Sequence, residues 1–112
     1  MTEIDHAQGI ADFLLAHRIS IDEDIDPDTG IHQYHFIIIG ESLREIGLVR
    51  FDSRRGTLLP IETEELRRRL QLPGFINNVV RPFNRLLLAE KGHFMLSAAF
   101  EPIHEALDQI DA

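Results

Sequence analysis

The fold is decided by Ile19-Ser20-Ile21-Asp22-Glu23-Asp24-Ile25, by Asp26-Pro27-Asp28-Thr29-Gly30, and by Ile31-His32-Gln33-Tyr34-His35-Phe36-Ile37-Ile38-Ile39. The first segment alternates apolar and acidic residues, which is typical of a strand with one buried and one solvated face. Proline, aspartate and glycine in the second segment favour a tight turn, because proline presets φ and glycine tolerates a left-handed conformation. The third segment ends in four consecutive apolar residues, which predicts a central strand buried on both faces. The stretch therefore predicts an antiparallel hairpin.

A second hairpin is predicted to follow the first. The segments 46–51 and 57–61 are separated by a turn that carries Arg54 and Arg55. Pro60 lies near the end of the last segment, and proline in a sheet is confined to strand ends and edges because it has no N–H. We therefore predict four consecutive antiparallel strands that form a meander.

Helices are predicted on both sides of these strands. Apolar residues recur at helical spacing from Glu3 to His17. Later helices are expected at 63–71, from Pro82 and from Pro102. The segment 75–81 is ambiguous, and 93–100 is compatible with either a fifth strand or a helical continuation.

This order of elements predicts a single α+β domain that spans residues 1–112. An N-terminal helix precedes a four-stranded antiparallel meander, and two or three helices cover one face of the sheet. The 112 residues, 44% of them hydrophobic, suffice for one core. The architecture is similar to that of the small bacterial secretion chaperones, although the last third lacks their usual second hairpin.

Composition excludes several classes of site. Cysteine is absent, so disulfides, thiolate metal sites and cysteine nucleophiles are ruled out. No apolar stretch approaches the roughly 20 residues that a membrane helix requires, and acidic Glu3 and Asp5 are unlike the start of a secretory signal. No glycine-rich phosphate loop is present, and no cofactor is expected. We expect a cytoplasmic protein without membrane contact.

The net charge of −8 is unevenly distributed along the chain. Residues 1–41 carry −8, residues 42–91 carry +4 and residues 92–112 carry −4. Either the acidic ends neutralise the basic middle within the fold, or a polarised surface meets a partner of complementary charge. Overall acidity makes nucleic acid an unlikely primary partner, because its phosphates bind basic surfaces.

The acidic turn resembles the start of an EF-hand calcium loop. Asp24, Asp26 and Asp28 alternate like the first oxygen ligands of that loop. Thr29 replaces its essential glycine, and His35 replaces its bidentate glutamate. A hairpin turn with acidic flanks explains the same residues, so these three aspartates are the weaker, metal-binding alternative.

Histidines offer a second candidate for metal binding or catalysis. His32 and His35 are three residues apart, which places them on opposite faces of a strand and prevents chelation of one ion. Convergence of either with His93 or His104 is left open. Surface or singly hydrogen-bonded histidines are the favoured interpretation.

These patterns contain no recognisable catalytic set and favour a protein-binding module, such as an adaptor, an immunity-type inhibitor or a chaperone. Arg54 and Arg55 at a hairpin tip, with Asp22 and Asp24 on an acidic strand, are the candidate contacts with another protein. A sheet edge can accept a strand from a partner. A homodimer through that edge or the last helix is compatible with the pattern.

Two alternatives stay open. One is a small enzyme whose site assembles from His32, His35, Tyr34 and arginine side chains around a cleft. The other is an acidic mimic of nucleic acid, which requires the carboxylates of residues 22–28 to line one continuous surface.

Overall fold

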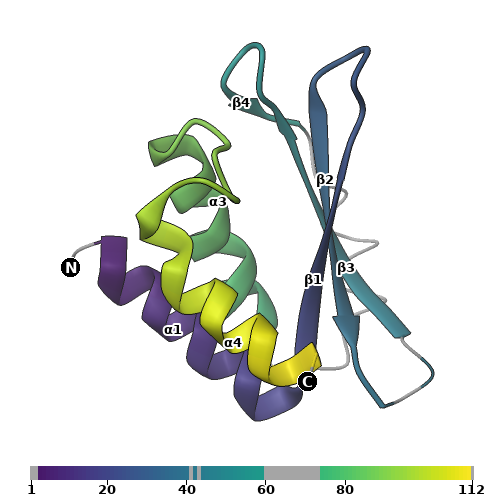
Figure 1. The fold of residues 1–112 in the computed structure, drawn as a ribbon, viewed down its shortest axis with the longest axis vertical. Coiled ribbons are helices and arrows are strands. Elements are labelled where there is room, and N and C mark those ends of the chain that lie inside the picture. Colours follow the sequence, from purple (N-terminus) through teal and green to yellow (C-terminus); the bar gives the residue numbers. More distant parts are fainter. Residues whose placement is uncertain (1–2, 41, 43, 60–73, 112) are drawn as a thin grey trace.

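Helices cover one face of a four-stranded antiparallel sheet, as Figure 1 shows. The computed structural model describes residues 3–40, 42, 44–59 and 74–111. Its elements are α1 (Glu3–His17), β1 (Ile19–Ile25), β2 (Ile31–Ile38), β3 (Arg44–Asp52), β4 (Thr57–Leu58), a π-helix (Ile76–Val80), α3 (Arg81–Ala89), a 3-10 helix (Ala98–Phe100) and α4 (Glu101–Asp111). The predicted α+β fold is confirmed.

The sheet is a meander with strand order β1-β2-β3-β4, so β1 and the two-residue β4 lie at its edges. β1 pairs with β2 in an unbroken register in which Glu23 lies opposite Tyr34. β2 pairs with β3 through a bulge, because Phe36 lies opposite Gly47 whereas Ile37 lies opposite Glu45. Ile46 is therefore the extra residue on β3, and its side chain is buried.

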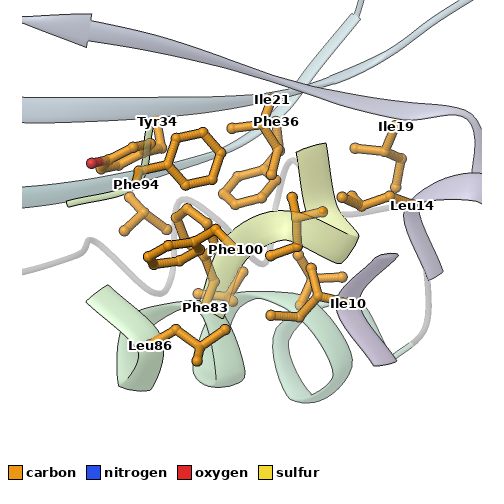
Figure 2. Packing of buried hydrophobic residues seen from close by; sticks show 14 of the residues in the cluster. Ile10, Leu14, Ile19, Ile21, Tyr34, Phe36, Phe83, Leu86, Phe94 and Phe100 are labelled. Carbon is orange, nitrogen blue, oxygen red and sulfur yellow. The ribbon is translucent and has the colours of Figure 1, made fainter. Parts of the chain in front are cut away.

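The core lies between the sheet and the helices, and a group of aromatic rings packs within it (Figure 2). The ring of Phe83 on α3 lies 5.2 Å from that of Tyr34 and 5.5 Å from that of Phe36, centroid to centroid. It also lies 5.6 Å from Phe94 and 6.0 Å from Phe100, both of which precede α4. Edge-to-face geometry in all four pairs is the preferred arrangement of aromatic quadrupoles.

The run 36–39 is less buried than its composition predicts. Phe36 is fully buried, but the three isoleucines that follow are only partly covered. β2 is nevertheless central, because it pairs with β1 on one side and with β3 on the other. The prediction of a central strand is thus confirmed. The prediction that both of its faces are completely buried is wrong for residues 37–39.

The segment 93–100 forms neither a fifth strand nor a continuous helix. Lys91 (φ 53°) and Gly92 (φ 77°) both adopt left-handed conformations after α3, and the Gly92 N–H donates to the Leu87 carbonyl. Turns follow, and Ser97 then caps the 3-10 helix by accepting a hydrogen bond from the Ala99 N–H at 3.2 Å. The ambiguous segment 75–81 is largely the π-helix, which leads directly into α3. The helix predicted at 63–71 lies outside the described residues.

None of the helices in the described ranges is long and apolar enough to cross a membrane.

Candidate functional site

The backbone of β1 alternates between facing β2 and facing outward. Two bonds fix the phase of this alternation: Ile39 N–H donates to Arg18 C=O, and Asp26 N–H donates to Ile31 C=O, both at 2.9 Å. Hydrogen-bonded and non-hydrogen-bonded pairs alternate in an antiparallel ladder, so even-numbered residues of β1 direct their backbone groups to β2. The N–H and C=O groups that face the free edge belong to Ile19, Ile21, Glu23 and Ile25.

The end of α4 closes the first half of this edge, as Figure 1 shows. Ser20 Oγ donates to Asp111 Oδ1 at 3.1 Å, and Ser20 is only 3% exposed. The second half differs, because Asp22 and Asp24 are exposed and Ile25 is 48% exposed. We call residues 22–25 the open edge segment. No described strand pairs with its outer side.

Two acidic side chains of the open edge segment lie on the face of the sheet opposite the helices. Asp22 lies opposite His35, and Asp24 lies opposite Gln33, on the neighbouring strand. Glu23 has the other orientation, because it lies opposite Tyr34, whose ring is buried in the core. Within the described part of the chain, neither aspartate carboxylate has a hydrogen bond or ion pair, so both remain available to a partner.

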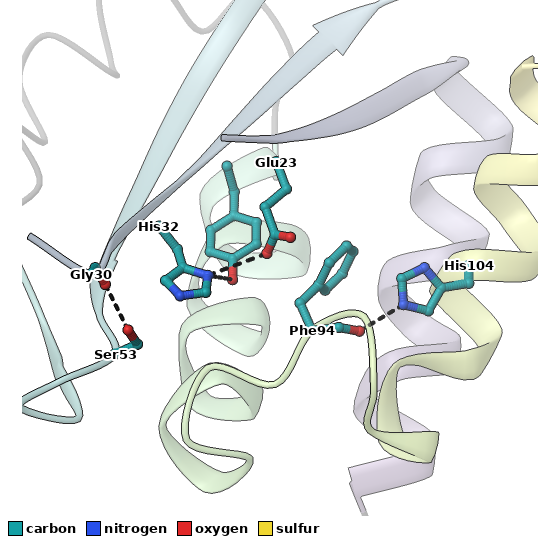
Figure 3. Close-up of polar contacts among 7 residues, drawn as sticks. Glu23, Gly30, His32, Ser53, Phe94 and His104 are labelled. Atoms are coloured by element: carbon teal, nitrogen blue, oxygen red, sulfur yellow. Dashed lines mark hydrogen bonds and ion pairs between the residues drawn. The ribbon is translucent and has the colours of Figure 1, made fainter. Parts of the chain in front are cut away.

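On the helix-facing side, Glu23, His32 and Tyr34 form a small polar cluster (Figure 3). His32 Nδ1 lies 3.5 Å from Glu23 Oε2 and 3.3 Å from the Tyr34 hydroxyl. Burial, reinforced by the nearby Glu23 carboxylate, raises the pKa of Tyr34 far above its usual value. The phenol therefore stays protonated at neutral pH, where it can donate a hydrogen bond but cannot act as a general base.

The other histidines lie away from this cluster. His35 is on the opposite face of the sheet, where its Nδ1 lies 2.8 Å from Glu45 Oε2. His104 on α4 places Nε2 2.7 Å from the Phe94 carbonyl oxygen, which fixes the loop before α4 (Figure 3). His93 is exposed. The structure thus brings His32 and Tyr34 together and places His35 on the opposite face of the sheet, away from them.

The acidic turn uses its central carboxylate to cap its own backbone. Asp26 Oδ1 accepts hydrogen bonds from the N–H groups of Asp28 at 2.9 Å and Thr29 at 3.4 Å. The hydrogen bond from the Asp28 backbone is the main cause of a lowered Asp26 pKa. Across the ranges that the structure describes, no three His, Asp or Glu side chains are placed to hold a metal ion.

The carboxylates of residues 22–28 also do not line one surface. Asp22 and Asp24 share the outer face, whereas Glu23 points toward the helices and Asp26 is engaged with its turn. These side chains therefore do not form the continuous row of charges at phosphate-like spacing that the nucleic-acid mimic requires.

The candidate arginines differ in their surroundings. Arg54 Nη2 donates to the Pro27 carbonyl at 3.2 Å, so Arg54 ties the second hairpin turn to the first. Ser53 supports the same junction by donating from its N–H and Oγ to the Gly30 carbonyl, at 3.0 and 2.7 Å (Figure 3). The side chain of Arg55 is 82% exposed and lies 3.8 Å from Asp52 Oδ2. Of the two arginines, Arg55 is the better placed to meet a partner.

Comparison with protein families, curated proteins and solved structures found no match to this chain. Sequence reasoning selected Asp22 and Asp24 but missed Glu23 and Ile25, whose backbone groups face the free edge. The turn itself carried the missing signal. A hairpin closed by Asp26 and Ile31 sets Glu23 opposite Tyr34, and this register fixes which residues face outward.

Proposed function

We propose that the protein is a protein-binding module that accepts an extended segment of a partner protein as an added strand along β1. The observation that supports this most directly is the outward-facing N–H and C=O of Glu23 and Ile25 on an exposed edge. Unpaired edge groups of this kind are a template for strand addition. The lack of cysteine fits the reducing cytoplasm as the compartment.

The partial closure of β1 supports a functional rather than incidental edge. α4 covers the strand near Ser20, through the bond to Asp111, and leaves the open edge segment uncovered. On the opposite side of the sheet, β4 has two described residues and is too short to align a partner. It pairs only with Phe51 and Asp52 of β3, so the outer side of residues 46–49 also faces no described strand. Natural proteins blunt edges with short strands and with covering elements. The open edge segment is neither short-stranded nor covered by another described element.

A partner other than a second copy is favoured by charge. Two β1 strands paired antiparallel through their open edge segments would oppose acidic residues in every register. Like charges directly across a strand pair are destabilising. A homodimer through this edge is therefore disfavoured, and the acids protect the edge from self-association.

The enzyme alternative has weaker support. It relies on His32 and Tyr34. Because the Tyr34 pKa is raised, its phenol stays protonated and can act only as a hydrogen-bond donor. His32 itself contacts Glu23 and stabilises the strand pair. We interpret this cluster as a structural support beneath the open edge segment.

Replacement of Ile25 by proline tests the proposal. Ile25→Pro removes the outward N–H without removing a ladder hydrogen bond, whereas Asp24→Pro removes an N–H that faces β2. We expect Ile25→Pro to change the free energy of unfolding by less than about 1 kcal/mol, and Asp24→Pro to cost about 1–3 kcal/mol. Urea unfolding measures both values and checks the backbone phase.

Partner capture from a lysate of the producing cell completes the test, with Ile25→Ala as the matched control that keeps the N–H. Proteins retained by the wild type and by Ile25→Ala, and lost from Ile25→Pro, would support strand addition. Retention of the same proteins by a folded Ile25→Pro variant would refute it.

A further inference from the structure

We infer that the added strand carries basic side chains at two alternating positions, beside Asp22 and Asp24, and an apolar side chain beside Ile25. This inference rests on the proposed function. It goes further by deriving the partner's sequence pattern from the register of β1. In the antiparallel direction the pattern reads apolar, basic, any residue, basic.

Two exposed acids on the outer face of the sheet favour basic residues in the added strand. Asp22 and Asp24 direct their backbone groups to β2, so a new strand meets them in non-hydrogen-bonded pairs. Side chains in such pairs approach most closely, with Cα atoms about 4.5 Å apart. Both carboxylates are exposed, and neither has a hydrogen bond or ion pair with another described side chain. Lysine or arginine at i and i+2 of the partner would face both carboxylates at once.

The inner face sets the remaining two positions. The side chain of Glu23 is 13% exposed and contacts His32, whose side chain is 14% exposed. The position opposite Glu23 therefore needs no charge of its own. Ile25 is 48% exposed and lies on the same face. An apolar partner residue opposite Ile25 would cover that side chain and remove apolar surface from water.

The adjoining turns extend this charge pattern only in part. Beyond Ile25, the Asp26 carboxylate already accepts hydrogen bonds from its own turn. The guanidinium of Arg54 donates to Pro27 in that turn. Asp28 is exposed but lies in the turn beyond β1, so an added strand would not meet it in register. The basic pattern is therefore limited to the two positions beside Asp22 and Asp24.

Three labelled peptides of equal length test the inference. The first carries lysines at i and i+2 with valine before them, and the second is an isomer with lysines at i and i+3. The third replaces both lysines by threonine. We expect the first to bind about tenfold more tightly than either of the others, because two opposite-charge cross-strand pairs form only with that spacing. Fluorescence anisotropy at low and high salt measures the affinities, and added salt should reduce the difference.

A pair of isosteric variants locates the contact. Asp22→Asn with Asp24→Asn should abolish the preference for the first peptide. Glu105→Gln with Asp108→Asn, on exposed positions of α4, changes the net charge equally and should leave the preference intact.

Amide exchange at Glu23 and Ile25, followed by NMR, distinguishes a failure of the basic pattern from a failure of strand addition. Protection of both amides by all three peptides with equal affinity would overturn the basic pattern and leave strand addition standing. If no peptide binds or protects these amides, strand addition along β1 fails and the inference fails with it. Selective binding of the first peptide with protection of both amides supports both.

Discussion

Tyr34 shows how a single buried polar group joins the core to the candidate site. Its ring packs against Phe83 and Phe94 with no exposed surface, while its hydroxyl reaches His32 at 3.3 Å. His32 in turn lies beside Glu23 on the open edge segment. The hydroxyl thus connects core packing to the strand that we propose as the binding edge.

The raised pKa of Tyr34 predicts a loss of stability at alkaline pH. In the unfolded chain the phenol ionises near its ordinary pKa of 10.0, whereas in the folded protein it stays protonated. Above that pH the unfolded state binds fewer protons than the native state, so the free energy of unfolding falls by about 1.4 kcal/mol per pH unit. The contribution is complete below pH 10.0 and is lost as pH rises. Tyr34→Phe should lack this slope.

The measurement is direct because the chain has one tyrosine and no tryptophan. We expect tyrosinate absorbance to appear only when the protein unfolds, as judged by circular dichroism across the same titration. Near neutral pH, Tyr34→Phe should cost about 1 kcal/mol for the lost hydrogen bond. Ionisation near the ordinary pKa in a protein that is still folded would contradict the burial of the hydroxyl.

At the scale of elements, the two hairpin turns act as one unit. Gly30 adopts φ 73°, and a Cβ there would lie 2.8 Å from Arg54 Cγ. This close approach allows the Arg54 guanidinium to reach the Pro27 carbonyl. The two turns are therefore joined through a backbone carbonyl at this junction.

This junction predicts different effects for the two adjacent arginines. Arg54→Ala should lower the free energy of unfolding by about 1 kcal/mol, because it removes a hydrogen bond and side-chain packing between the turns. Arg55→Ala, at an exposed side chain, should stay within about 0.5 kcal/mol of the wild type. Urea unfolding compares them. Equal losses for both variants would show that the turns are held by other contacts.

Local sequence signals predicted the elements that depend on local chemistry. The bounds of α1 and β1 agree with the predicted ones, because helical spacing and strand alternation there match the tertiary environment. Longer-range contacts decided what the sequence did not reveal. The loop after Gly92 is held by His104 from the next helix, and Arg54 is held by a carbonyl 27 residues earlier. The outward phase of Glu23 and Ile25, by contrast, follows from the local turn between β1 and β2.

At the scale of the whole molecule, Phe83 is one of the residues at which the sheet and the helices meet. Its buried ring contacts Tyr34 and Phe36 on the sheet, and Phe94 and Phe100 before α4. Loss of such a ring leaves a cavity that touches both layers. We expect Phe83→Ala to cost about 3–5 kcal/mol, which is a large part of the 5–15 kcal/mol typical of a domain.

Two probes test whether that loss is shared by both layers. Tyrosine fluorescence reports the sheet through the single Tyr34, and far-ultraviolet circular dichroism reports mainly the helices. In urea, Phe83→Ala should shift both transitions together, because one core supports both layers. Phe13→Ala is the matched control, since that ring is only partly buried and lies at the margin, 6.3 Å from Phe75. Separate transitions, or a smaller loss than in the control, would mean that the sheet and helices do not share one core centred on Phe83.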